Sequence, residues 1–121
     1  SRTSKTPTSM YLANRGIKAA NVPLVSGQPA PDALENIQGP LVVGLVNSVK
    51  RLVELRRSRL LLLNENAETP YADEDEIKKE IAAARRLFTR HSWPVIDTTG
   101  RSIEETAAAI MKLHANWARL T

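Results

Sequence analysis

The residues best suited to chemistry stand at the start of the chain. Residues 1–6, Ser-Arg-Thr-Ser-Lys-Thr, come directly before a helix expected over Pro7–Arg15. A phosphate-binding loop needs backbone N–H groups at a helix N-terminus, a Lys that reaches the phosphates and a hydroxyl for Mg²⁺. Lys5 and Thr6 are of the right type for the last two roles. Ser4 stands where that motif has its second glycine, so a polar helix cap is the competing interpretation.

A run of arginines forms the second candidate site. Residues 50–59, KRLVELRRSR, contain five bases and the single acid Glu54. Arginine forks bind phosphate oxygens in pairs and stabilise the charge that spreads during phosphoryl transfer. Near a phosphate loop, Arg56, Arg57 or Arg59 would act in this way, and elsewhere the run would be a solvated helix face. Residues 65–76 hold six acids and no base, which argues against nucleic-acid binding.

The third candidate is the turn Asp97-Thr98-Thr99-Gly100, which follows an expected strand over 93–97. Ligands bind beside the carboxyl ends of strands in open α/β sheets, so Asp97 is a candidate ligand contact. A strand-ending Asp with a helix-capping turn is the alternative. His91 is expected at a helix end and His114 on an apolar stripe, and both are interpreted as structural.

The expected secondary structure alternates between helices and strands. Strands are predicted at 22–25, 41–46 and 93–97, and helices at 7–15, 49–63, 73–90 and from 103, with one helical turn near 31–37. This order predicts an α/β fold with three layers, in which helices flank a parallel sheet. A strand before residue 1 would complete the pattern. Without it the sheet edges are open, which favours strand exchange in a homo-oligomer as one hypothesis.

Length and composition limit the classes of protein. The chain has 121 residues and a net charge of +4, so residues 1–121 are expected to form one domain. No apolar run approaches the roughly 20 residues that cross a bilayer. The absence of Cys excludes disulfides, thiol nucleophiles and thiolate metal sites within this sequence. There is no secretory signal and no initiator Met, so we expect part of a longer, cytoplasmic protein.

Three segments resemble a known family. Residues 1–25, 39–64 and 84–110 are similar to the C-terminal part of the bacterial pyruvate, phosphate dikinase regulatory proteins, whose relatives regulate phosphoenolpyruvate synthase. The family's nucleotide loop reads Gly-Val-Ser-Arg-Thr-Ser-Lys-Thr, and residues 1–6 match six of these eight positions. The resemblance implies a P-loop nucleotide-kinase-like fold without its first strand. It makes this sequence a partial domain, the nucleotide-binding part of a longer protein.

The resemblance also implies an activity. Such proteins use ADP to phosphorylate a threonine beside the catalytic histidine of the dikinase, and they reverse this by phosphorolysis with inorganic phosphate, giving pyrophosphate. It implies that residues Ser1, Arg2, Thr3, Ser4, Lys5 and Thr6 bind ADP, that Thr6 binds Mg²⁺, and that Lys5, Arg56 and Arg59 act in catalysis. The alternative is a non-catalytic interaction module that docks on a large enzyme through its basic helix. A more distant likeness to adenylate-kinase-like enzymes involves Glu54, Arg59 and Asp97.

Overall fold

The computed structural model describes residues 5–24, 29–64 and 72–120 of the chain. In these ranges the structure has five helices and two strands: α1 (Lys5–Asn14), α2 (Asp32–Glu35), β1 (Gly44–Val46), α3 (Val49–Leu62), α4 (Glu74–Arg90), β2 (Val95–Asp97) and α5 (Ile103–Leu120). Helices alternate with strands as the sequence predicts. None of the described helices is long and apolar enough to cross a membrane.

The strands pair in parallel. Gly44 lies opposite Val95 and Val46 opposite Asp97, and the connection between the strands runs through α3 and α4. The pairing extends one residue further, because Thr98 donates its backbone N–H (2.8 Å) and its hydroxyl (3.0 Å) to the Val46 carbonyl. The parallel α/β arrangement expected from the sequence is therefore confirmed at these two strands.

The strand predicted at 22–25 is wrong over the residues that can be compared. Residues 17–24 form no strand, and Val25 lies outside the described residues. Pro23 has no N–H to donate to a ladder, and Asn21, Val22 and Pro23 are exposed rather than buried in a sheet. The strand predicted over 41–46 is also shorter, at Gly44–Val46. The sheet within the described ranges thus has two strands instead of three.

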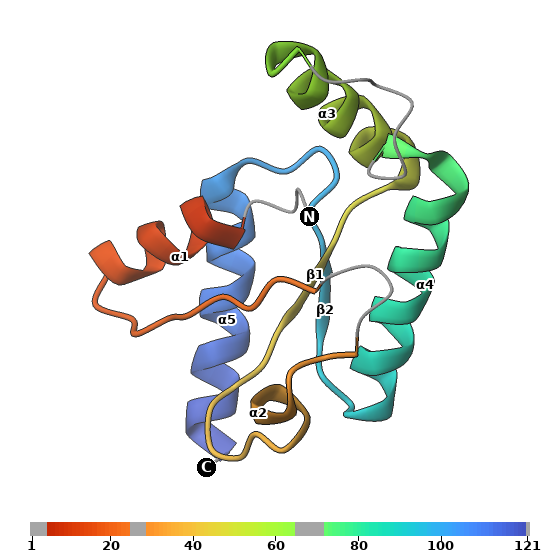
Figure 1. Ribbon diagram of the computed structural model, residues 1–121. Coiled ribbons are helices and arrows are strands. Elements are labelled where there is room, and N and C mark those ends of the chain that lie inside the picture. The colour runs from red at the N-terminus through yellow and green to blue at the C-terminus, as the bar shows by residue number, and fades with distance from the viewer. Residues whose placement is uncertain (1–4, 25–28, 65–71, 121) are drawn as a thin grey trace.

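Helices flank the sheet on both sides. Figure 1 shows α1 and α5 on one side of the strands and α4 on the other. α1 packs on α5, α3 packs on α4, and α4 also contacts β1. The outer end of α3 projects beyond the rest of the molecule (Figure 1). This arrangement agrees with the three layers that the sequence predicts.

The core between β1 and α4 depends on a close approach at Gly44. A Cβ atom at Gly44 would lie 2.5 Å from the ring of Phe88, so only glycine leaves room for this ring. The core here is a cluster of buried residues from three elements, Leu34, Val46, Leu87 and Phe88. A second cluster joins α3 to α4 and consists of Leu52, Val53 and Ile77. α4 is therefore fixed both to the sheet and to α3.

Two helices, α3 and α5, start near the carboxyl ends of the strands. Ser48 follows β1 and caps α3, because its Oγ accepts the Arg51 N–H at 3.1 Å. Ser102 and Glu105 exchange side-chain hydrogen bonds with each other's N–H groups at 3.1 and 3.3 Å, which is a capping box at the start of α5. The first turn of α1 lies at the same end of the strands in Figure 1. It begins at Lys5, two residues earlier than predicted.

Candidate functional site

The structure brings together two of the predicted catalytic cations. Lys5 is partly buried in the first turn of α1, and Arg56 is buried on α3 with 3% of its surface exposed. Burial, and secondly the positive charge of Arg56, lower the pKa of the Lys5 ammonium below its ordinary value. Two residues far apart in the sequence therefore lie within electrostatic reach of each other.

Arg56 is held by a carboxylate from the next helix. Its Nη1 donates to Oε2 of Glu80 at 2.7 Å, and its Nη2 donates to Oε1 at 2.9 Å. The Glu80 side chain on α4 is 16% exposed, so the pair is largely shielded from water. A two-bond arrangement of this kind fixes the plane of the guanidinium as well as its position. We call Lys5, Arg56 and Glu80 the charge cluster.

Sequence reasoning missed Glu80. A signal was present, because Glu80 lies three residues after Ile77 and one before Ile81, beside the apolar stripe of its helix. A carboxylate that packing draws away from water needs a partner. The sequence does not say which cation supplies it.

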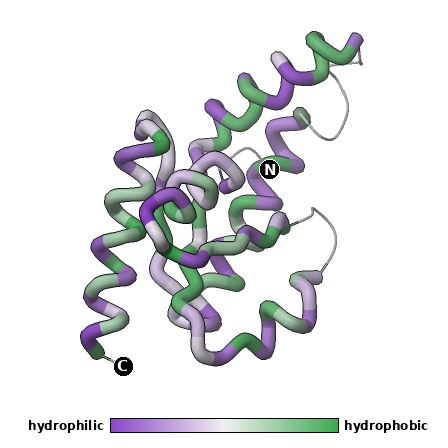
Figure 2. Tube along the Cα trace, turned by 90° about the vertical axis from the view of Figure 1, so that its left-hand side faces the viewer, coloured by the Kyte–Doolittle hydropathy of each residue, from purple (hydrophilic) through white to green (hydrophobic). Residues whose placement is uncertain are grey.

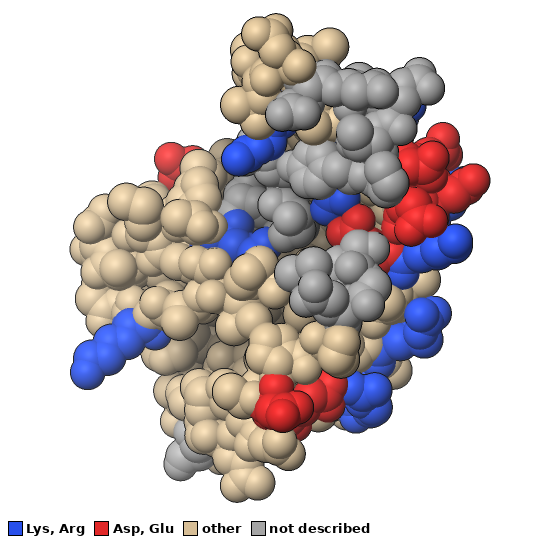
Figure 3. All heavy atoms as spheres, in the orientation of Figure 1, with Lys and Arg blue, Asp and Glu red and all other residues tan. Residues whose placement is uncertain are grey.

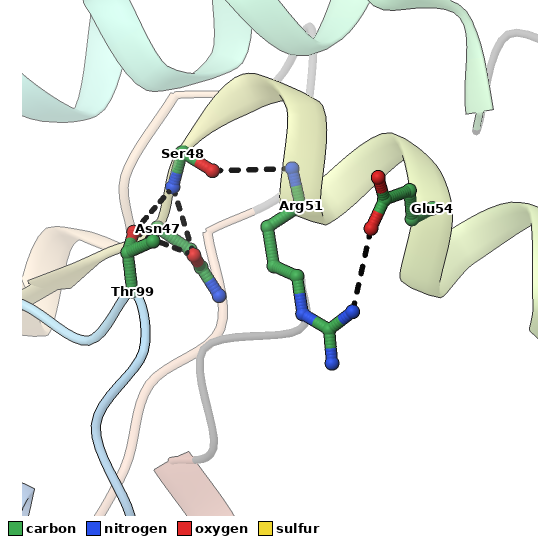
Figure 4. A network of polar contacts seen from close by, with 5 residues as sticks. All are labelled: Asn47, Ser48, Arg51, Glu54 and Thr99. Carbon is green, nitrogen blue, oxygen red and sulfur yellow. Dashed lines mark hydrogen bonds and ion pairs between the residues drawn. The ribbon is translucent and has the colours of Figure 1, made fainter.

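Arg59, the third predicted catalytic residue, lies in the last turn of α3 and is exposed. Among the ion pairs of the described residues, none includes Arg59. It therefore differs from Arg56, one turn earlier on the same helix, which is buried and oriented. Glu54, also on α3, is exposed and pairs with Arg51 at 3.4 Å (Figure 4).

The predicted nucleotide loop is only partly described. Residues 1–4 lie outside the described residues, so the roles expected for Ser1, Arg2, Thr3 and Ser4 stay predictions. Thr6 is exposed in the first turn of α1, directly beside Lys5. No group of three or more His, Cys, Asp or Glu side chains suited to a metal occurs in the described part of the chain. A hydroxyl such as that of Thr6 fits Mg²⁺ that takes its other ligands from phosphates and water.

A hydrogen-bond network joins the loops that follow the two strands. The Asn47 Oδ1 accepts the Ser48 N–H and the Thr99 hydroxyl, both at 2.8 Å. The Ser48 N–H also lies 2.9 Å from the Thr99 Oγ1. Figure 4 shows these three residues meeting where α3 begins. The network fixes the carboxyl edge of the sheet at the start of α3, the helix that carries Arg56 of the charge cluster.

Asp97 is used to shape the turn after β2. Its Oδ1 accepts the Thr99 N–H at 2.9 Å. Hydrogen bonds from Thr99 have the largest effect and lower the pKa of the Asp97 carboxyl. Burial opposes them more weakly, and the charges of Arg85 and Arg101 add small effects that lower the pKa. Of the two interpretations that the sequence allows, these contacts favour the structural one, a charged Asp that holds a turn.

The histidines make structural contacts. The His91 ring stacks on Trp93 with centroids 4.3 Å apart, and its Nε2 lies 3.1 Å from Oε2 of Glu35. Arg90 also pairs with Glu35, so the end of α4 is tied to α2. His114 lies beside Trp117 on α5, with ring centroids 5.6 Å apart. His91 precedes β2 and is therefore at the opposite end of the strands from the turn that contains Thr99.

Acidic and basic side chains gather in separate places on the face of the molecule that Figure 3 shows. Figure 3 shows acidic side chains gathered over the start of α4 and basic side chains further along the same helix. Other basic side chains lie between the α1–α5 pair and α3. The sequence order of acids before bases on α4 complements its dipole, with Glu74, Asp75 and Glu76 in the first turn and Arg90 in the last.

The sequence that carries this site is similar to a known protein family and to several known proteins. The family model described as kinase/pyrophosphorylase matches residues 1–111. Proteins named pyruvate, phosphate dikinase regulatory protein are 60% identical in Erythrobacter litoralis and Sphingopyxis alaskensis and 59% identical in Caulobacter vibrioides. The matches cover 94%, 93% and 93% of this chain but 41%, 42% and 36% of those proteins. This chain thus spans about two fifths of the length of these relatives. No solved structure matches it.

Proposed function

Because this chain belongs to the kinase/pyrophosphorylase family, we propose that it is the nucleotide-binding part of a bifunctional regulator of pyruvate, phosphate dikinase. The regulator phosphorylates a threonine of the dikinase with ADP as donor. It removes that phosphate by phosphorolysis, with inorganic phosphate as acceptor and pyrophosphate as product. The observation that carries the proposal is the approach of Lys5, at the start of a helix, to the buried and oriented Arg56.

The charge cluster suits the transfer of a β-phosphoryl group. With ADP as donor, the transferred group is the β-phosphoryl, so the Lys5 ammonium contacts the α- and β-phosphates and the amides of residues 1–6 surround them. Arg56 neutralises charge on the transferring group, and exposed Arg59 acts only if the bound target closes over it. Magnesium bound with the nucleotide would neutralise further phosphate charge, and the Thr6 hydroxyl would hold it.

The names of the relatives favour the dikinase as the target over phosphoenolpyruvate synthase. A regulator of a central metabolic enzyme acts in the cytoplasm, where its target lies. The target's threonine would enter beside Lys5 and Arg56, at the carboxyl edge of the sheet. The helix starts at this edge offer N–H groups and partial positive charge to phosphate oxygens.

The test is the dependence of ADP binding on Lys5, measured by calorimetry on the complete natural protein that carries this chain. Lys5→Ala should weaken ADP binding by about tenfold or more, the loss expected for a charged contact to phosphate. Lys112→Ala, which removes an exposed cation from α5, should leave ADP binding unchanged. Equal ADP affinity of Lys5→Ala and the unaltered protein would reject the nucleotide-loop assignment.

A second candidate function is docking without catalysis, and one observation favours it. The outer end of α3 carries three consecutive exposed leucines, Leu61, Leu62 and Leu63, at 66%, 85% and 59% exposure. The exposed Arg57 and Arg59 lie beside them, and Figure 2 shows hydrophobic residues at this projecting end. Replacing Arg57 and Arg59 together should abolish binding to the dikinase under this alternative, whereas Lys5→Ala should not.

A further inference from the structure

We propose that Glu80 is a positioning residue of the nucleotide site, which holds the guanidinium of Arg56 in a fixed orientation beside Lys5. The proposal rests on the proposed function, because it names a residue that tunes the same phosphate contacts. Glu80 itself touches no phosphate in this proposal. It acts through Arg56, with which it shares two hydrogen bonds of 2.7 and 2.9 Å.

The backbone that carries Glu80 is well anchored. One turn before it, Ile77 is fully buried against Leu52 and Val53 of α3. Two turns after it, Phe88 packs against Gly44 of β1. The Glu80 carboxylate is therefore held in a fixed place relative to both α3 and the sheet. An arginine that would otherwise sample many rotamers is in this way ordered before any ligand arrives, which lowers the entropy lost on binding.

The charge of Glu80 matters as well as its place. Arg56 is 3% exposed, and a buried cation without a counter-ion is strongly unfavourable. Arg56 already lowers the pKa of the nearby Lys5 ammonium. Glu80 supplies the counter-charge that the buried Arg56 needs, and its two hydrogen bonds orient the guanidinium.

A purely structural ion pair between α3 and α4 is the alternative, and nucleotides with different phosphate numbers separate the two. AMP lacks the β-phosphate that Lys5 and Arg56 are proposed to bind. Loss of folding would weaken AMP and ADP binding alike. Loss of positioning would weaken ADP binding specifically, so the ratio of the AMP and ADP dissociation constants would fall.

The experiment measures both dissociation constants by calorimetry on the complete natural protein with Glu80→Gln, Glu80→Asp and the control Glu74→Gln. A glutamine has one acceptor oxygen, and its NH₂ group would face the second guanidinium nitrogen, so the two-bond geometry is lost. Glu74 is on the same helix, but its pair with Lys78 is exposed. Glu80→Gln should lower the ratio of the AMP dissociation constant to the ADP dissociation constant by about tenfold. This corresponds to the loss of one hydrogen bond to a charged group. Glu74→Gln should leave this AMP/ADP ratio unchanged.

An unchanged or increased ratio in folded Glu80→Gln overturns the proposal, because Glu80 would then be only a structural or opposing charge. If Glu80→Gln does not fold, Glu80→Asp decides, since it keeps the charge and withdraws the carboxylate by one methylene. An AMP/ADP ratio that is several-fold lower in folded Glu80→Asp supports positioning. A ratio equal to that of the unaltered protein overturns the proposal. An unaltered protein that binds no ADP rejects the proposed function itself, whereas normal binding with insensitive variants rejects only the role of Glu80.

Discussion

Arg56 of α3 and Glu80 of α4 form an ion pair with two hydrogen bonds, of 2.7 and 2.9 Å, in a place where both side chains are largely buried. This pair changes the interpretation of the basic run 50–59. Arg56 lies four residues after Leu52 and three after Val53, so it shares their buried face, whereas Arg57 and Arg59 are exposed. Arg56 is thus the one arginine of the run that is buried and oriented by a carboxylate of another helix.

The first prediction concerns the stability of this pair. Arg56→Met leaves the Glu80 carboxylate with no counter-ion from Arg56, so it should lower the free energy of unfolding by about 3 kcal/mol. The double variant Arg56→Met with Glu80→Leu replaces both charges by apolar side chains and should recover most of that loss. Urea unfolding followed by circular dichroism gives both values. A double variant no more stable than Arg56→Met would contradict a buried, mutually compensating pair.

The second prediction concerns Lys5, whose lowered pKa has a cost for folding. A cation with a native pKa below its unfolded value of about 10.4 opposes folding while it is charged. This opposition is complete below the native pKa and disappears as the pH rises toward the unfolded value. Lys5→Met should therefore raise the melting temperature at neutral pH, with a smaller gain near pH 10, while it weakens ADP binding.

Thermal unfolding of the unaltered protein and of Lys5→Met at several pH values measures this effect. Lys112→Met serves as the control, because Lys112 is exposed on α5. A Lys5→Met variant that is less stable at neutral pH would show that the contacts of Lys5 favour folding overall, which is the opposite of the expected sign.

Much of the fold follows from local signals in the sequence. The caps at Ser48 and Ser102 are signals of this kind, because each uses residues within three positions along the chain. The parallel pairing of β1 and β2 follows from strands separated by helices. The strand predicted at 22–25 from its apolar residues does not form over residues 22–24, because Pro23 has no N–H to donate to a ladder.

The candidate site was less predictable than the fold. The place of Lys5 before a helix and the position of Arg56 in a basic run make both residues predictable from the sequence. Glu80 is not predictable in this way, because α4 carries several acids and the sequence does not show which of them faces α3. That information lies in the packing of Ile77 against Leu52 and Val53, which sets the rotation of one helix against the other.

The third prediction concerns the close approach of α4 to the sheet. In Gly44→Ala, the new Cβ would lie 2.5 Å from the Phe88 ring and force the helix outward. This overpacking should destabilise the protein by about 1–3 kcal/mol. Phe88→Leu in the same chain removes the ring and should make the Gly44→Ala change less harmful than it is alone. Additive losses in a double-mutant cycle of urea unfolding would show that the two residues do not interact.

The fourth prediction concerns the projecting end of α3. Leu62 is 85% exposed, so Leu62→Ser should change the free energy of unfolding by less than about 0.5 kcal/mol. If this end contacts the target enzyme, the same change should weaken binding to pyruvate, phosphate dikinase and leave ADP affinity unaltered, because Leu62 lies beyond the charge cluster on α3. Binding of the complete protein to immobilised dikinase measures the first effect and calorimetry the second. Leu120→Ser, at the equally exposed end of α5, is the matched control, and equal dikinase binding by both variants would remove the outer end of α3 from the interface.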